Sequence, residues 1–378
     1  MILAAVVALP SLASAGKILL FLVMLSVLIV LHELGHFVLA RINRVRVNDF
    51  ALGMGPTILK RTSPRSGTNY RLNLFPIGGY CAMQGEDGKT NEAHQQREFR
   101  AAVVPHAEDN FQAKSPWQRL AIIVAGPLAN FAVAFVLMLA IAVGFGTPVA
   151  TATVGVLQPD MPAQRAGLRP GDTIVSVDGR AVTDGEMLVT TIHSSAGKQL
   201  TLGVRRDQTT FSVRVTPVQR KLAGKEVGLI GFAPKQEMHR AGLVAGIADA
   251  ATGFWTILVM QLAMLLALVT APAQTFGGLA GPVGIAAVSG QYQDLGWGPY
   301  LFLAAQISVS LGIFNLLPIP ALDGGRGAFI VAELLRGKPV DPEKEAFVHF
   351  AGFAALMLLM VFVTYHDIVR LVAGKGAL

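Results

Sequence analysis

Long apolar blocks alternate with polar stretches along the 378 residues of this chain. The first block runs from Ile18 to Ala40 and is interrupted only by the sequence HELGH at residues 32–36. A helix needs about 20 residues to cross the hydrocarbon core of a bilayer, at about 1.5 Å of rise per residue. The pattern therefore predicts a membrane-spanning helix within residues 1–44.

Three further apolar blocks predict three further spans. They lie within residues 117–146, 299–325 and 326–378, the last of them at 346–364. Residues 1–16 end in a sequence typical of a signal-peptide cleavage site, but no basic segment precedes it. We expect these residues to be an uncleaved lead-in to the first span, with their removal as the alternative.

The polar stretches predict two smaller units. Within residues 45–116, two strand-like runs flank a turn signal between Pro64 and Gly67, which predicts a β-hairpin followed by a loop. Residues 150–236 have ordinary charge, short β-rich runs and frequent turn signals, as a soluble domain has. Residues 237–298 hold an apolar segment and a Gly-rich connector.

The composition supports a membrane protein. Only 15% of the residues are charged and 52% are hydrophobic, whereas a soluble domain carries about 25% charged residues. The single cysteine, Cys81, excludes an internal disulfide. We assign the net charge of +7 to membrane orientation, because Lys and Arg are retained on the cytoplasmic side and no nucleic-acid motif is present.

His32 and His36 are four residues apart, so both imidazoles lie on one face of a helix and can reach one zinc ion. Glu33 projects beside the same position, where it can act as the general base toward the attacking water. Two histidines and a glutamate in an apolar span are costly unless they are paired or bind a metal. The sequence therefore predicts one Zn²⁺ per chain, with Glu33 as the catalytic residue.

A catalytic zinc site uses three protein ligands and keeps one open position. Asp323 is the best candidate for the third ligand, because it follows an apolar span and precedes two glycines that allow a sharp turn. Pro318 and Pro320 interrupt the helix just before it, which suits a segment that lines a cavity. Taken alone, Asp323 would be an acid at a helix end in the water interface; beside two histidines, we favour the ligand.

HELGH in the first span and NLLPIPALDGG in a late span together resemble the site-2 protease family of intramembrane zinc metalloproteases, in its regulator-of-sigma-E protease branch. GPLAN at 126–130 resembles the second-span motif of this family, and PIGGY at 76–80 resembles its hairpin loop. The resemblance implies cleavage of transmembrane segments of single-pass proteins, such as an anti-sigma factor already trimmed by a site-1-type protease, or of remnant signal peptides. It also implies a place in the bacterial inner membrane.

The same resemblance implies a substrate-binding role for Asn315 and for the second strand of the hairpin, which would pair with unwound substrate. We assign Asn130 to substrate binding as well, because an asparagine at membrane depth is costly without a partner. The predicted substrate-binding residues are Asn315, Asn130, Tyr70, Arg71, Leu72, Asn73 and Leu74.

Residues 162–179 resemble the corresponding segment of a PDZ domain. In this comparison, a later segment would form the loop and strand that bind a peptide carboxylate. We find one such domain, whereas the best-known member of the family carries two in tandem. The predicted peptide-binding residues are Gly228, Leu229, Ile230 and Gly231.

For His36 and Asp323 to meet at one depth, their two spans must run in the same direction through the membrane. This places the basic loop in 45–116 in the cytoplasm and the PDZ domain outside. An even number of crossings, most simply none, then separates that domain from the third span, so we expect residues 250–271 to lie along the outer membrane face. The predicted fold is a polytopic α-helical membrane protein with four transmembrane helices, a membrane-associated β-hairpin and an inserted α+β PDZ domain.

Two other functions compete with proteolysis. A silent membrane scaffold could use the PDZ domain to bind peptide tails, but we would then expect one of His32, Glu33, His36 or Asp323 to be missing. A zinc or ion transporter could place histidines and acids in the membrane, but transporters tend to show internal repeats, and Glu33 would be unexplained. Proteolysis of a transmembrane substrate separates an enzyme from both.

Overall fold

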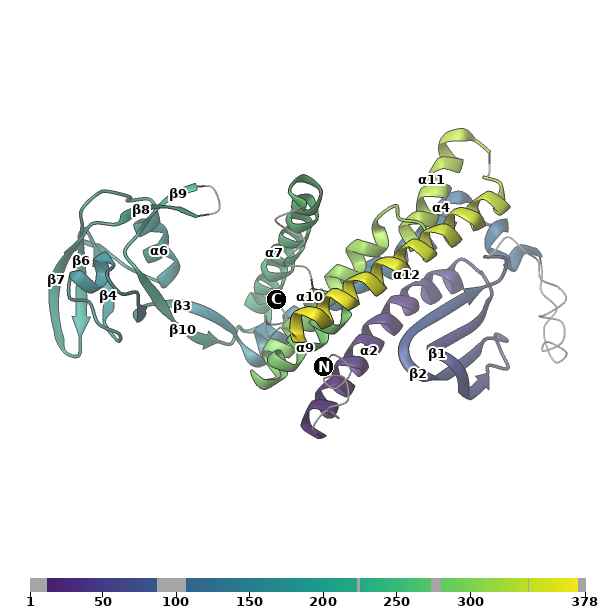
Figure 1. The fold of residues 1–378 in the computed structure, drawn as a ribbon, viewed down its shortest axis with the longest axis horizontal. Coiled ribbons are helices and arrows are strands. Elements are labelled where there is room, and N and C mark those ends of the chain that lie inside the picture. The colour runs from purple at the N-terminus through teal and green to yellow at the C-terminus, as the bar shows by residue number, and fades with distance from the viewer. Residues whose placement is uncertain (1–11, 87–106, 223–224, 273–279, 339, 373–378) are drawn as a thin grey trace. The chain divides into compact units, whose positions relative to one another are not determined.

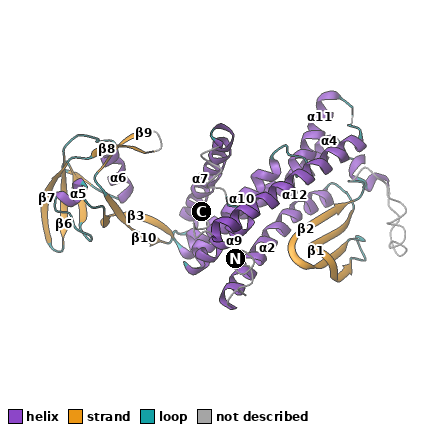
Figure 2. Cartoon of the chain, viewed as in Figure 1, coloured by secondary structure: helices purple, strands orange, loops and turns teal. Residues whose placement is uncertain are grey.

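The computed structural model describes residues 12–86, 107–222, 225–272, 280–338 and 340–372. The chain divides into two compact units, which we describe separately (Figure 1). One unit comprises Met1–Ile141 and Ile247–Leu378 and is mainly helical, whereas the other, Ala142–Gly246, is mainly β-structure (Figure 2). Most of the predicted lead-in and of the loop predicted after the hairpin lies outside the described residues.

Five helices in the described part of the chain are long and apolar enough to cross a membrane. Four of them fall where the sequence predicts spans, and the fifth contains residues 250–271. The predicted count of four transmembrane helices is therefore not confirmed. The five segments are Ala15–Ile42, Pro116–Phe145, Leu243–Thr270, Trp297–Leu316 and Glu343–Arg370.

The helical unit is built around α2 (Leu12–Ile42), α4 (Pro116–Ala140) and α10 (Trp297–Leu316), and α4 packs against both of the others. Small residues allow this close approach, because an added Cβ on Gly35 would lie 2.9 Å from the Cβ of Ala129. The HELGH segment of α2 is thereby held against the GPLAN segment of α4. Short turns flank α4: η1 (Ala107–Asp109), η2 (Phe111–Ala113) and η3 (Ile141–Phe145).

Helix α7 (Leu243–Thr270) packs along α4 and α10. Its Ile257 is only 5% exposed, within a cluster formed with residues of both helices. Further along, Gln261 Nε2 donates to the backbone carbonyl of Gln306 at 2.9 Å, and Gln261 Oε1 accepts from Ser310 Oγ at 3.1 Å. These contacts join α7 to α10 as far as Ser310, whereas the predicted placement of this segment along the membrane face stays a prediction.

Strands β1 (Val47–Thr62) and β2 (Asn69–Met83) form the predicted hairpin, with an irregular register. Residues 49–52 of β1 pair with two parts of β2. One partner is the end of β2, at 79–82, and the other is its beginning, at 69–72. The two strands therefore form a small sheet in which the first part of β1 is central.

The second part of β1, residues 57–62, turns back onto residues 69–73 of β2. Gly53 and Gly55 adopt φ angles of 80° and 86°, which only glycine adopts readily, and they allow this bend in β1. Residues 69–72 consequently have strand partners on both sides, whereas Asn73 pairs with Thr57 alone. The two edge segments of this sheet are 57–62 and 79–83, each of which has a strand partner on one side only among the described residues.

The later helices of this unit are α9 (Pro282–Asp294), α11 (Asp323–Arg336) and α12 (Pro342–Val372). The chain leaves α10 after Leu316, passes Pro318 and Pro320, and turns at Ala321, whose φ is 76°. An added Cβ on Gly324 would lie 2.6 Å from the carbonyl carbon of Leu316, so the turn requires glycine there. This tight return makes Asp323 the first residue of α11.

The inserted unit holds a sheet in the order β10-β3-β4-β6-β7, with β5 beside β4, and a separate β8–β9 hairpin. Its own hydrophobic core includes Ile174, Leu188 and Leu202, all with 0% exposure, as an independent domain requires. Its elements are β3 (Thr147–Leu157), α5 (Pro162–Arg165), β4 (Thr173–Val177), β5 (Arg180–Ala181), α6 (Gly185–His193), β6 (Leu200–Arg206), β7 (Thr209–Val215), β8 (Val218–Leu222), β9 (Lys225–Leu229) and β10 (Phe232–His239).

Candidate metal centre

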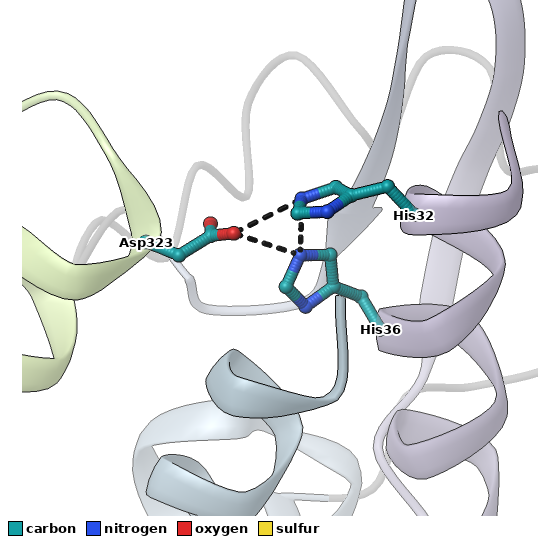
Figure 3. Close-up of side chains that lie close together, drawn as sticks. All are labelled: His32, His36 and Asp323. Atoms are coloured by element: carbon teal, nitrogen blue, oxygen red, sulfur yellow. Dashed lines mark hydrogen bonds and ion pairs between the residues drawn. The ribbon is translucent and has the colours of Figure 1, made fainter. Parts of the chain in front are cut away.

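Three potential metal ligands converge from elements that are far apart in the sequence (Figure 3). His32 and His36 project from α2, and Asp323 begins α11. The Oδ2 atom of Asp323 lies 3.0 Å from His32 Nε2 and 3.2 Å from His36 Nε2, and the two Nε2 atoms are 3.2 Å apart. The structure thus brings together all three ligands predicted from the sequence.

This triangle of atoms fits a zinc ion. With metal–ligand bonds of about 2.0–2.1 Å, the ligand atoms of a tetrahedral site lie about 3.3 Å from one another. Asp323 Oδ2 is buried and makes no hydrogen bond of normal geometry with a described residue, although both imidazoles lie within 3.2 Å, so its charge calls for a cation. Two imidazoles and a carboxylate are the donor set of a catalytic zinc site with one open position.

The backbone of α4 fixes the orientation of His36. Its Nδ1 lies 2.9 Å from the carbonyl oxygen of Ile122, which can only accept, so Nδ1 carries the proton and Nε2 presents a lone pair. Gly126 makes room for both rings, because an added Cβ there would lie 2.6 Å from His36 Cε1 and 2.8 Å from His32 Cε1. The site therefore requires glycine at this position of the GPLAN sequence, because any side chain would overlap the two imidazole rings.

Asn130 lies beside His32, with its Nδ2 atom 3.0 Å from His32 Nδ1. The residue is 0% exposed, and its Oδ1 atom has no hydrogen-bond partner among the described residues. Its backbone carbonyl accepts from Ser308 Oγ at 2.8 Å, which ties this part of α4 to α10. The structure therefore places Asn130 in contact with His32. Asn130 also lines the smaller cavity beside the site, and its role in substrate binding stays a prediction.

Glu33 follows His32 on α2 and borders both cavities that reach the site. The backbone amide of Cys81 in β2 lies close enough to its carboxylate to stabilise the negative charge. The strand passes close to the glutamate, because an added Cβ on Gly79 would lie 3.6 Å from Glu33 Cγ. The hairpin thus holds the carboxylate beside the metal ligands, where it can exchange protons with water.

Two cavities open onto the site and share Glu33 and Asp323. The larger has a volume of about 670 Å³ and is lined by the end of the hairpin together with residues of α11 and α12. The smaller, of about 230 Å³, is bordered by Asn315, which the sequence predicts to bind substrate. Its other lining residues include Ile29, His32, Asn130, Leu311 and Leu322.

The part of the hairpin nearest the site is not the predicted one. Residues Tyr70, Arg71 and Leu72 have strand partners on both sides, so their backbone cannot add a substrate strand, whereas Asn73 pairs on one side with Thr57. Leu74 follows Asn73, is 52% exposed and does not line either cavity. The edge that reaches the larger cavity is 79–83, through Tyr80, Cys81, Ala82 and Met83.

Polar contacts that the sequence did not predict surround the larger cavity. Arg326 of α11 forms an ion pair with Glu86, which follows the hairpin. The backbone amide of Ala321 donates to His349 Nδ1 at 2.9 Å, so α12 contacts the segment that precedes Asp323. A histidine in the last apolar block was a sequence signal for this contact, whereas Glu86 in the polar loop gave none.

The predicted carboxylate-binding loop of the inserted domain lies at the junction of β9 and β10. Gly228 and Leu229 end β9, Ile230 is buried at 1% exposure, and Gly231 turns the chain with a φ of 82°. The carbonyl of Ile230 accepts from the Ala163 amide at 2.8 Å, which fastens the loop to α5. Strand β10 follows as an edge strand of its sheet, so a peptide could pair with it.

An ion pair stabilises the inserted domain away from this loop. Arg206 Nε donates to Asp172 Oδ1 at 2.7 Å, and Arg206 Nη2 donates to Oδ2 at 2.8 Å. Asp172 is 1% exposed, and its hydrogen bonds from Arg206 hold the pKa of its carboxyl below the usual value. This pair is structural and has no place in the metal centre.

The sequence resembles known proteins over nearly its full length. The model of peptidase family M50 matches residues 20–359. The zinc metalloprotease RasP of Geobacillus kaustophilus is 32% identical, over 92% of this chain and 96% of the relative. A putative zinc metalloprotease of Clostridium acetobutylicum is 36% identical, over 91% and 95%, and the regulator of sigma-W protease RasP of Bacillus subtilis is 32% identical, over 93% and 98%.

Solved PDZ domains resemble part of this chain. The PDZ domain of an SdrC-like protein from Listeria monocytogenes is 22% identical, covers 22% of this chain and 83% of that chain, and gives a TM-score of 0.19. A Listeria innocua PDZ domain is 22% identical, over 24% and 99%, with a TM-score of 0.20. The assignment to a family therefore rests on the sequence relatives.

The family match extends over most of the chain, and the first relatives named above, with at least 32% identity, are called zinc metalloproteases or the regulator of sigma-W protease. The alignments cover at least 91% of this chain and 95% of each of these relatives, so the comparison covers the helical unit and the inserted domain alike. The chain belongs to peptidase family M50, the site-2 protease family, and is a zinc-dependent metalloprotease with membrane helices.

Proposed function

We propose that this protease hydrolyses peptide bonds within the transmembrane segments of single-pass membrane proteins. The observation that carries the proposal is the position of the site on an apolar helix. His32, Glu33 and His36 lie within the candidate span Ala15–Ile42, and the two histidines are only 7% and 5% exposed. A protease that acts on soluble chains has no need of a site at this depth.

In this proposal, His32, His36 and Asp323 bind one zinc ion through the three atoms that converge in Figure 3. Zinc, when bound, polarises the scissile carbonyl and lowers the pKa of water. Glu33 acts as the general base: its carboxylate takes a proton from the attacking water and gives it to the leaving nitrogen as the carbon–nitrogen bond breaks. The Cys81 amide, close to that carboxylate, stabilises its charge.

The substrate must be extended before its peptide bonds can be reached, because a helix encloses its own backbone hydrogen bonds. The segment 79–83 of β2 is the place where an extended substrate segment can pair, since it has a described strand partner on one side only, β1, and lines the larger cavity. Asn315, on the smaller cavity, offers an amide to the substrate backbone. This assignment replaces the predicted pairing with residues 70–74.

By resemblance to the family, we place the enzyme in the bacterial inner membrane, with the inserted domain on the extracytoplasmic side. The basic residues between α2 and α4 support that orientation, because Lys and Arg are retained in the cytoplasm. The inserted domain selects substrates that another protease, of the site-1 type, has already trimmed. Gly228, Leu229, Ile230 and Gly231 form its peptide-binding loop.

The decisive experiment uses the purified full chain in liposomes with a single-pass model substrate, and mass spectrometry to map the products. We expect cleavage within the transmembrane segment of the substrate and none with Glu33→Gln. Equal cleavage by wild type and Glu33→Gln would overturn the mechanism. A scaffold or a transporter would give no products with either protein, and cleavage only in soluble flanks would contradict the intramembrane assignment.

A further inference from the structure

The two histidine ligands have different partners at Nδ1. His36 faces the Ile122 carbonyl, which can only accept a hydrogen bond, so this ring has one tautomer available. His32 faces the side-chain amide of Asn130, which has both a donor and an acceptor. Which of the two ring nitrogens of His32 carries the proton therefore depends on how that amide is turned.

The orientation in the structure serves only one tautomer of His32. Asn130 Nδ2 lies 3.0 Å from His32 Nδ1, so Nδ1 must accept and the ring proton must be on Nε2. That proton then points toward Asp323 Oδ2, 3.0 Å away. A metal ligand needs the opposite arrangement, with a lone pair on Nε2 and the proton on Nδ1.

A half-turn of the Asn130 amide supplies that arrangement. The oxygen and nitrogen of an asparagine amide have nearly the same shape, so they can exchange places without displacing neighbours. After the turn, Oδ1 lies at His32 Nδ1 and accepts its proton, which leaves Nε2 free. Because Asn130 is 0% exposed and its backbone is bonded to Ser308, the side chain is held at this distance.

We propose that Asn130 is a positioning residue that selects the tautomer of His32 that binds the metal. The side chain acts as an acceptor in the zinc-bound protein and as a donor when Nε2 carries the proton, so one residue satisfies both states of a buried ring. This inference rests on the proposed zinc ligands, and it gives Asn130 a role in metal binding rather than in substrate contact.

The test measures zinc affinity by competition with a chelator on the purified full chain in detergent, with no substrate present. Asn130→Leu keeps the volume but removes the acceptor, and we expect affinity to fall about 10–100-fold. Asn130→Asp offers only acceptors, and we expect it to bind zinc at least as tightly as wild type. Ser310→Ala is the matched control, because it removes a hydrogen bond from α10 to Gln261 and leaves Asn130 and its backbone contact with Ser308 unchanged.

Zinc affinity that is lost in Asn130→Leu but kept in Asn130→Asp distinguishes a hydrogen-bonding role of Asn130 from a role in packing alone. If Asn130→Leu and Asn130→Asp lose affinity equally, or if Asn130→Leu binds zinc like wild type, the inference is overturned. Asn130→Ala provides a second acceptor-free variant if the Leu variant does not elute as a monodisperse protein. His32→Ala separates the claim about the zinc site from the claim about Asn130. If His32→Ala retains zinc, the proposed site itself is refuted. If His32→Ala loses zinc but Asn130→Leu keeps it, only the role of Asn130 is refuted.

Discussion

The ring of His36 occupies the space that a side chain at Gly126 would need: an added Cβ would lie 2.6 Å from His36 Cε1. Neither partner can retreat easily, because Gly126 belongs to the backbone of α4 and the ring is hydrogen-bonded to Ile122 of the same helix. The metal centre is therefore shaped as much by α4 as by the helices that carry its ligands.

Gly126→Ala should for this reason weaken zinc binding at least about tenfold. Substitutions that disturb the residues orienting metal ligands have effects of about this size. Zinc content after dialysis against a chelator is the measurement. Gly144→Ala is the control, because an added Cβ at that glycine would meet nothing within 4 Å. Unchanged zinc binding in Gly126→Ala would mean that the rings lie elsewhere.

The backbone of Cys81, rather than its thiol, is predicted to matter for catalysis. Cys81→Pro removes the backbone N–H that lies beside Glu33 and should reduce cleavage at least about tenfold while zinc stays bound. Cys81→Ala keeps the amide and should cleave at nearly the wild-type rate, since burial raises the pKa of the thiol to about 12 and leaves it unreactive. Equal rates for the two variants would contradict this role of the amide.

The local patterns of the sequence predicted the ligands but not their surroundings. The spacing of His32 and His36 and the cost of charge in an apolar span were sufficient to identify the metal site. The double pairing of residues 49–52, by contrast, depends on a bend at Gly53 and Gly55 that brings distant segments together. Register of this kind leaves no local pattern, so the sequence alone favours pairing at 70–74, whereas from the structure we propose 79–83.

The location of helix α7 is a second feature that the sequence alone could not predict. Its apolar character was clear from the sequence, but the direction of the neighbouring spans favoured a surface location. The contacts of Gln261 with Gln306 and Ser310 are tertiary, and only the structure reveals them. Similarly, the sequence indicates that a buried asparagine at position 130 costs free energy without a hydrogen-bond partner, but it does not show that this partner is His32.

We predict that α7 inserts into the membrane. In a Cys81→Ser background, a cysteine at Gly246 should react with an impermeant reagent added from the outer side, whereas one at Thr270 should not. Thr270 lies nine residues beyond Gln261, about 13 Å further along the helix. Labelling of both positions from outside would restore the surface placement of residues 250–271.

The stability of the inserted domain should depend on pH through Asp172. Its folded pKa is lowered by Arg206, so the stabilisation is present above the unfolded value of about 3.9 and is lost as the pH falls through the folded pKa. Arg206→Leu in the isolated unit Ala142–Gly246 should therefore unfold at a lower temperature than wild type at pH 7, with a difference that narrows toward pH 3. Arg205→Leu, at an exposed neighbouring position, is the control, and a pH-independent difference would contradict the account.

The most direct test of the central claim is the zinc content of purified full-length protein, measured by mass spectrometry for wild type, Glu33→Gln and Asp323→Ala. The account predicts about one zinc per chain in wild type and in Glu33→Gln, because the base is not a ligand, and almost none in Asp323→Ala, because two imidazoles alone leave the three-ligand site incomplete. One zinc per chain in Asp323→Ala, equal to wild type, would contradict it.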